Sequence, residues 1–147
     1  MNDQRVDINK ALNSGATPFY IACEFGHIDI VKLLLNDNEA DIHKAKYDDT
    51  TPFYVACRSG NIEIVKLLLN DNRVDINKAN NDGGTPFYIV CEKGTIAIVE
   101  LLLNEKRLSI RKKSNQGKTA FDIAKSNNHL EIMKLIKEVD TGNLLNN

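Results

Sequence analysis

Long apolar runs, a signal peptide and an excess of one charge are all missing from this sequence of 147 residues. No apolar stretch reaches the roughly 18 residues that a membrane-spanning helix needs, which excludes such a helix. The N-terminal segment MNDQRVDINK has no apolar centre and is not expected to be a signal peptide. With 19 basic and 20 acidic residues, the chain has no overall field that would favour nucleic acid.

Cysteine is scarce as well, since Cys23, Cys57 and Cys91 are the only three. An odd number at even spacing is unlike a secreted disulfide framework and indicates a reducing, intracellular compartment. We expect the cytoplasm, with the nucleus as the alternative. Equivalent residues on stacked helices lie roughly 8–10 Å apart, too far for a disulfide or a shared zinc ion. The three thiols are therefore predicted to be reduced, buried and unliganded.

Patterns typical of catalysis are absent from the sequence. It contains no glycine-rich phosphate loop and no paired acidic motif on a predicted helix. His27, His43 and His129 fall at predicted turns or helix starts, and no serine, cysteine or carboxylate recurs beside them as in a catalytic triad. We therefore predict a protein that is not an enzyme and that has no metal ion or cofactor.

An internal repeat is the main feature that the sequence does contain. TPFYIAC at 17–23, TPFYVAC at 51–57 and TPFYIVC at 85–91 recur every 34 residues, and a degraded copy, TAFDIAK, follows at 119–125. A fixed period of this length indicates one structural unit that has been copied and stacked. Such an array favours recognition over catalysis as the function.

Each unit predicts a short helix, a turn and a second helix. The threonine of the repeated string suits an N-cap, and the proline after it suits the first helical position. Gly26 and its equivalents should end this helix in a left-handed turn. The apolar run at 28–35 predicts a second helix that packs on several sides. Asn36 and its equivalents are expected to end that helix in the left-handed conformation.

These features resemble the ankyrin repeat, whose signature is T-P-L-H-x-A and whose unit is helix, turn, helix and a projecting hairpin. The resemblance covers essentially the whole chain and implies an all-α repeat solenoid. The period is 34 rather than the family's usual length of about 33, because the segment from Leu35 to Asp41 holds one residue more. Tyr20, Tyr54 and Tyr88 replace the family's histidine. We expect these tyrosines to form a ladder, with their hydroxyls on polar partners.

The fourth unit has the polar character that a terminal capping repeat needs for solubility. Asp122 stands at its tyrosine position, Lys125 at its cysteine position and Asn128 at its glycine position. The short tail that follows is expected to be frayed. The chain therefore divides into a partial repeat tail at 1–12, ankyrin repeats at 13–46, 47–80 and 81–114, a C-terminal capping repeat at 115–139 and a tail at 140–147.

Residues 2–11 align with residues 70–79, so the chain begins inside a repeat whose helices are absent. We expect the C-terminal piece of a longer array, the alternative being a gene that starts there. Without a preceding unit, Leu12, Phe19 and the apolar flank of 28–35 should be uncovered. The first repeat is then the predicted weak end of the array. We expect a monomer, with weak self-association through this uncapped repeat as the alternative.

The resemblance implies that a partner binds on the concave face, built from hairpin tips and the exposed side of each first helix. The copies differ most just before the threonine and just after the cysteine, as contact positions would, although drift of exposed residues gives the same pattern. Phe25, Tyr47 and Arg58 are types enriched at interface hot spots. The predicted contact residues are Ser14, Ala16, Glu24, Phe25, Tyr47, Asp48, Thr50, Arg58, Ser59, Asn81, Asp82, Glu92, Lys93, Gln116 and Lys118.

We therefore expect a non-enzymatic module that binds an unidentified partner protein and neither nucleic acid nor a membrane. The competing interpretation is a structural spacer segment of a longer ankyrin solenoid without a dedicated partner. The basic segment KRLSIRKK at 106–113 has two functional interpretations, a nuclear localisation patch and a contact for an acidic partner. Because it has no interleaved aromatic residues, nucleic-acid binding by this segment is disfavoured, and a solvated hairpin edge is the favoured interpretation.

Overall fold

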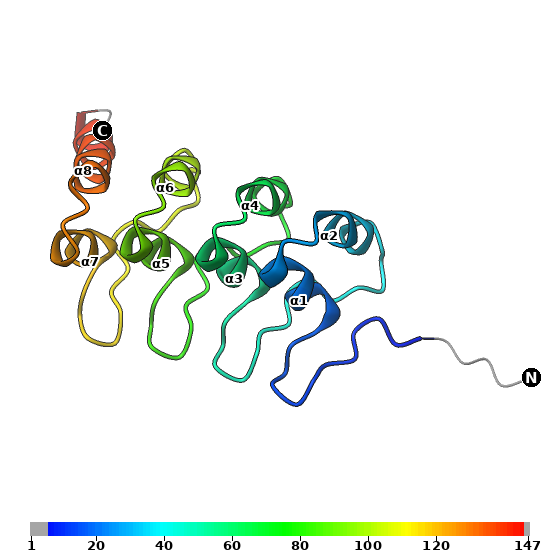
Figure 1. Cartoon of the computed structure of the whole chain (residues 1–147). Coiled ribbons are helices and arrows are strands. Elements are labelled where there is room, and N and C mark those ends of the chain that lie inside the picture. Colours follow the sequence, from blue (N-terminus) through cyan, green and yellow to red (C-terminus); the bar gives the residue numbers. More distant parts are fainter. Residues whose placement is uncertain (1–5, 146–147) are drawn as a thin grey trace, which may run out of the picture.

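The computed structural model describes the backbone of residues 6–145 and the side chains of residues 6–142. Within this range eight α-helices and no β-strand occur, and the helices are paired and stacked in one direction (Figure 1). This arrangement confirms the predicted all-α repeat solenoid. No helix in the described range is long and apolar enough to cross a membrane. The pairs are α1 (Pro18–Phe25) with α2 (Ile28–Leu35), α3 (Pro52–Ser59) with α4 (Ile62–Leu69), α5 (Pro86–Lys93) with α6 (Ile96–Leu103), and α7 (Ala120–Ser126) with α8 (Leu130–Leu145).

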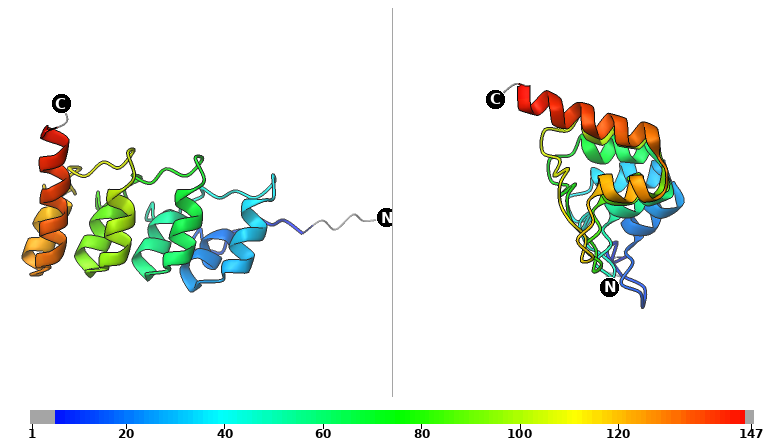
Figure 2. Two further views of the ribbon diagram at one scale, coloured as in Figure 1. Left: turned by 90° about the horizontal axis from the view of Figure 1, so that it is seen from above. Right: turned by 90° about the vertical axis from the view of Figure 1, so that its left-hand side faces the viewer.

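The helices form two layers, and hairpin loops project beyond the first of them. α1, α3, α5 and α7 lie side by side in one layer, and α2, α4, α6 and α8 in the other (Figures 1 and 2). The main contacts join each helix to its own partner and to neighbouring pairs. Seen along the stack, the loops leave the helix layers at an angle (Figure 2, right). We call the surface formed by the hairpin loops and the first helices the concave face.

The first helix of each repeat begins and ends as the sequence predicts. The Thr17 hydroxyl accepts a hydrogen bond from the backbone N–H of Tyr20 at 3.2 Å, and Thr51 and Thr85 make the equivalent bonds at 3.0 and 3.1 Å. The proline after each threonine has no N–H that would need a partner. Gly26 ends α1 at a φ of 76°, in the left-handed region that residues with a side chain avoid. Short-range chemistry therefore fixes both ends of this helix.

The second helices end differently from the prediction. Asn36, Asn70 and Asn104 have φ values of −89°, −78° and −79°, in the right-handed region, so the expectation of a left-handed end is wrong. The chain turns instead through hydrogen bonds, because the Asp37 carboxylate accepts from the Glu39 N–H at 2.8 Å and the Asp37 N–H donates to the Leu34 carbonyl. A turn closed by an aspartate side chain needs no residue with positive φ.

The hairpin loops turn at equivalent residues and bond to one another. Each loop contains a tight turn, with positive φ at Gly15, Gly83 and Gly117, and at Asp49 in the second repeat. One backbone bond joins each loop to the next: the N–H of Tyr47 donates to Ser14, that of Asn81 to Asp48, and that of Asn115 to Asp82, at 3.3, 2.9 and 2.9 Å. The loops therefore form a ladder along the concave face.

The three cysteines lie in the core, and their predicted burial is confirmed. Cys23, Cys57 and Cys91 are free thiols whose side chains are fully buried at the contacts between first helices. Burial raises the pKa of Cys23 and Cys91 to about 12, and that of Cys57 further in the same direction. A thiol with a raised pKa holds less of the reactive thiolate at any given pH.

The cysteines should therefore react with a thiol reagent only when the protein opens. At pH 8 we expect native protein to label slowly with an aromatic disulfide reagent, and protein unfolded in guanidinium to release three equivalents at once. The physical reason is twofold, since the sulfur atoms are shielded from the reagent and are protonated at this pH. Rapid labelling of all three thiols in the native state would contradict the buried placement.

The first repeat exposes apolar side chains that later repeats bury. Ile30 on α2 is 46% exposed, whereas its equivalents Ile64 and Ile98 are 2% and 0% exposed. Leu12 and Leu33 are exposed as well. The expectation for Phe19 is wrong, because this side chain is as buried as its equivalents and so needs no preceding unit to cover it. The apolar surface that a preceding unit was expected to cover is therefore exposed on α2 and at Leu12, but not at Phe19.

The last repeat is more ordered than predicted. α8 continues to Leu145, so the expectation of a frayed tail is wrong for residues 140–145, while residues 146–147 lie outside the described part. An ion pair of 3.4 Å between Arg111 and Asp140 joins this helix to the preceding loop. Asp122 accepts a bond from the Thr119 N–H at 2.9 Å, and the Thr119 hydroxyl accepts one from the Asp122 N–H. This capping box starts α7 without the proline of the other repeats.

Candidate partner-binding surface

The residues predicted to contact a partner fall into three groups by exposure. Ten are exposed, namely Ser14, Phe25, Tyr47, Asp48, Ser59, Asn81, Asp82, Lys93, Gln116 and Lys118. Glu24, Arg58 and Glu92 are half-buried, and Ala16 and Thr50 are buried. Phe25 at the end of α1 and Tyr47 in a hairpin loop stand out, because these large side chains are 67% and 77% exposed.

Ala16 and Thr50 are corrections to the predicted contact set. Both occupy the position just before the capping threonine, where the hairpin loop returns to the first helix. Thr50 is buried there against Tyr20 of the preceding repeat. Ala16 and Thr50 are therefore not exposed to a partner, whereas Lys118 at the same position of the fourth unit is exposed.

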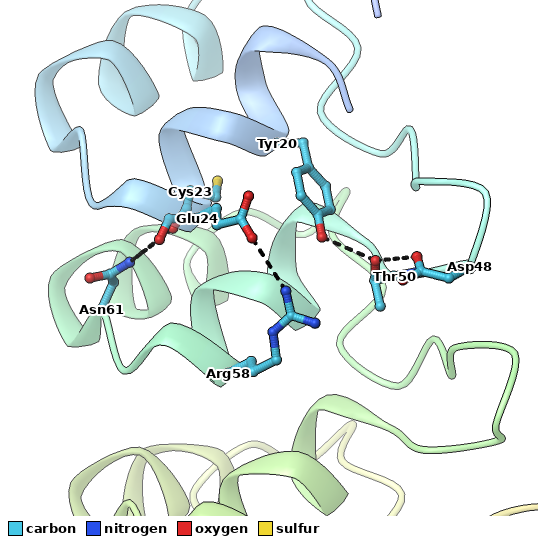
Figure 3. Close-up of polar contacts among 7 residues, drawn as sticks. All are labelled: Tyr20, Cys23, Glu24, Asp48, Thr50, Arg58 and Asn61. Atoms are coloured by element: carbon cyan, nitrogen blue, oxygen red, sulfur yellow. Dashed lines mark hydrogen bonds and ion pairs between the residues drawn. The ribbon is translucent and has the colours of Figure 1, made fainter. Parts of the chain in front are cut away.

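A chain of hydrogen bonds runs from the core of the first repeat to the concave face (Figure 3). The Tyr20 hydroxyl lies 3.0 Å from the Thr50 hydroxyl, which in turn donates to the Asp48 carboxylate. The Thr50 N–H donates to the same carboxylate at 3.0 Å. Burial alone would raise the pKa of Asp48, but these two bonds outweigh it and hold the pKa below its usual value. Burial raises the pKa of Tyr20.

The next tyrosine finds a different partner. The Tyr54 hydroxyl accepts a bond of 3.3 Å from the Asn80 side chain, whose carbonyl oxygen accepts from the N–H groups of Gly84 and Asp82 at 3.0 and 3.1 Å. Gly84 stands where Thr50 stands one repeat earlier, so no hydroxyl is available at that place. The predicted tyrosine ladder, with hydroxyls on polar partners, is confirmed for Tyr20 and Tyr54.

Removing the buried hydroxyl should destabilise the array measurably. Tyr20→Phe leaves the Thr50 hydroxyl without its donor, and we expect the free energy of unfolding to fall by about 1 kcal/mol. The matched control is Tyr47→Phe, because that ring is exposed and its loss of a hydroxyl should change almost nothing. Urea denaturation followed by circular dichroism measures both variants. Equal effects would show that the ladder hydroxyl contributes nothing to stability.

A second set of polar contacts joins the ends of neighbouring first helices (Figure 3). Arg58 lies 3.4 Å from the Glu24 carboxylate, and its guanidinium sits over the Tyr54 ring at 6.0 Å from the centroid. The Asn61 side chain donates to the Cys23 carbonyl at 2.9 Å. Two of the predicted contact residues, Glu24 and Arg58, therefore already pair with each other. Half-exposed pairs of this kind add little stability but do fix side-chain positions.

A polar groove lies on the concave face, between the second, third and fourth repeats. Its volume is about 390 Å³. The rings of Tyr54 and Tyr88 come from first helices, as does the Glu92 carboxylate, while Asp82 and Gln116 come from hairpin loops. All five of these lining residues have polar or acidic ends that a partner would meet. The structure thus brings the predicted contacts Asp82, Glu92 and Gln116 together at one site.

The basic segment 106–113 serves as a brace inside the array. Arg107 donates to the carbonyls of Val74 and Leu69 in the preceding repeat, both at 2.9 Å. Lys112 reaches the Asn77 carbonyl at 3.4 Å, and Arg111 makes the ion pair with α8. This role was not predicted from the sequence. Arg73 stands one repeat earlier at the position of Arg107, and it makes the same kind of bond to the Leu35 carbonyl at 3.1 Å.

The histidines of the described residues lie at a contact between repeats or on the surface. His129 bonds through its Nε2 to the Glu92 carbonyl at 3.0 Å, and His27 and His43 are exposed. Over residues 6–142, no group of three or more His, Cys, Asp or Glu side chains is placed to hold a metal ion. The arrangement offers shape, charge and hydrogen-bonding groups to a partner.

Comparison with known families gives one finding. A model of ankyrin repeats, built on three copies of the unit, matches residues 2–80 and again residues 72–144, which together span nearly the whole chain. A search of curated proteins gave no match.

Proposed function

Because the chain belongs to the ankyrin-repeat family, we propose that it is a non-enzymatic module that binds a partner protein on its concave face. Ankyrin repeats generally act as protein–protein interaction modules and are typically not enzymes. Three buried, free cysteines support the expected reducing compartment inside the cell.

The observation that carries this proposal is the exposure of two aromatic side chains that the fold does not need. Phe25 and Tyr47 are 67% and 77% exposed. The equivalent residues are Ser59 and Lys93 for Phe25, and Asn81 for Tyr47, so polar side chains satisfy the repeat equally well. Exposed aromatic residues on a rigid framework are the usual anchors of an interface.

A capture experiment tests the proposal against the spacer interpretation. Immobilised wild-type protein is exposed to host lysate beside the double variant Phe25→Ala/Tyr47→Ala and a matched control, Leu33→Ala/Leu130→Ala. The control residues are large, apolar and about equally exposed, but they lie on second helices at the two ends of the array. A partner retained by wild type and control and lost in the double variant supports the proposal. Identical capture of one partner by all three proteins would show that Phe25 and Tyr47 make no contact with it, whereas no specific partner at all favours a spacer.

A further inference from the structure

The groove on the concave face contains two carboxylates that have lost the internal partners of their equivalents. Glu92 corresponds to Glu24, which pairs with Arg58 of the next repeat. Ser126 stands in the place of that arginine for Glu92. Among residues 6–142 no basic side chain forms an ion pair with Glu92.

The second carboxylate is free for a similar reason. Asp82 corresponds to Asp48, which accepts two hydrogen bonds from Thr50. In the third repeat Gly84 replaces that threonine, and its N–H donates to the side chain of Asn80 instead. Over the described range, the Asp82 carboxylate has neither a hydrogen-bond donor nor an ion-pair partner. Gly84 and Ser126, which replace a threonine and an arginine, therefore leave the carboxylates of Asp82 and Glu92 available to accept hydrogen bonds at one site.

The remaining lining suits a cation that also carries hydrogen-bond donors. The rings of Tyr54 and Tyr88 offer aromatic surface, and Gln116 offers a carbonyl oxygen. The Ser114 hydroxyl also lines the groove, shielded from solvent and close to the Tyr88 hydroxyl. A volume of about 390 Å³ lies within the range of ligand pockets, about 300–1,000 Å³.

The charges around the tyrosines agree with a site for a cation. Burial raises the pKa of Tyr54 to about 12. Glu92, Asp82 and Asp48 act in the same direction as burial, and Arg58 is the one nearby charge that opposes them. Burial also raises the pKa of Tyr88, with Glu92 and Asp122 adding to it and a hydrogen bond with Ser114 opposing it. The charges that act on the two tyrosines are thus mostly acidic, although the net charge of the whole chain is only −1.

We propose that the groove receives an arginine or lysine side chain of the partner protein, held between the carboxylates of Asp82 and Glu92 and over the tyrosine rings. This inference rests on the proposed function and specifies the chemistry of its partner. A planar guanidinium can bond a carboxylate with two parallel N–H groups while it stacks on an aromatic ring, so arginine is the better occupant. The partner segment therefore carries a basic residue at the point where it crosses the third hairpin loop.

Selection from a random library of displayed 12-residue peptides tests the inference with the full chain as the target. We expect selected peptides to share an arginine or lysine at one position. The double variant Asp82→Asn/Glu92→Gln should weaken their binding at least about tenfold, as measured by isothermal titration calorimetry. The matched control is Asp29→Asn/Glu63→Gln, which removes the same charge from positions on α2 and α4, outside the groove. Its effect should stay below about twofold, because distant charges are screened by salt.

A cycle of substitutions separates direct contact from general charge attraction. Replacing the shared basic residue of the peptide by glutamine should cost about as much as the double variant, and should cost nothing further when tested against that variant. Peptides that need Phe25 and Tyr47 but lack a shared basic residue would overturn this inference and leave the proposed function standing. Binding to the groove variant as tight as to wild type would do the same. Failure to select any peptide, or selection only of peptides insensitive to both sets of variants, would overturn both.

Discussion

Ile98→Ala should lower the free energy of unfolding by about 4 kcal/mol, close to the upper end for a buried isoleucine. Ile98 lies on α6, which contacts both α4 and α8, and its side chain is completely buried. Truncation there removes apolar surface from the core and leaves a cavity that rigid neighbouring helices cannot fill. Urea denaturation followed by circular dichroism gives the loss.

The matched substitution at the other end of the array is Ile30→Ala. Ile30 holds the same position on α2, but it is 46% exposed because no helix pair covers that side. We expect a loss of about 1 kcal/mol, since less surface is removed from the core and water fills the space. Equal losses at the two positions would mean that α2 is covered in solution, for example by a second molecule. Sedimentation of the wild-type protein would then reveal the dimer.

Gly83→Ala should destabilise the protein by about 3 kcal/mol through the hairpin ladder. Gly83 has a φ of 77°, where a residue with a side chain is strained by about 1–2 kcal/mol. A Cβ atom at this place would also lie 2.7 Å from the backbone nitrogen of Asn115 in the next loop. That nitrogen donates to the Asp82 carbonyl, so relief of the clash costs the hydrogen bond, worth about 1 kcal/mol.

Gly117→Ala separates the cost of backbone strain from the cost of a steric clash with the neighbouring loop. Gly117 turns the next loop at the same φ of 77°, but a Cβ atom there would meet nothing within 4 Å. We expect a loss of about 1–2 kcal/mol, from backbone strain alone. Thermal unfolding of the two variants side by side measures the difference. If both cost the same, contact between neighbouring loops plays no part in the stability of the array.

The helix starts and ends that depend on interactions over a few residues were predicted well from the sequence. Thr17 could be assigned as a cap because its hydroxyl reaches an N–H only three residues away. Gly26 could be assigned as a helix end because the left-handed conformation is a local preference of glycine. The exception among local features is Asn36, for which a left-handed conformation was predicted. The Asp37 side chain closes the turn by a hydrogen bond instead, which conformational propensity alone does not predict.

Features that depend on neighbours were predicted less well. Variation between copies indicated exposure at Thr50, but this residue is buried and its hydroxyl bonds to the tyrosine of the preceding repeat. The brace formed by Arg107 joins residues 33 and 38 positions apart, a distance at which composition and spacing carry no signal. The groove was not predicted as a site. Its carboxylates lack partners because Gly84 has no hydroxyl like that of Thr50, and Ser126 has no guanidinium like that of Arg58.

The stacking of the helix pairs has a mechanical consequence. Each pair contacts mainly the pair before and the pair after it, and each hairpin loop bonds to the next through a single backbone bond. A pull applied at the two ends along the stack would load these contacts in series, so that each junction carries the full force. Resistance would then be set by the weakest junction, and extension would proceed in steps of one repeat. Under such a force the repeats would unfold one after another, and the array would not unfold in a single step.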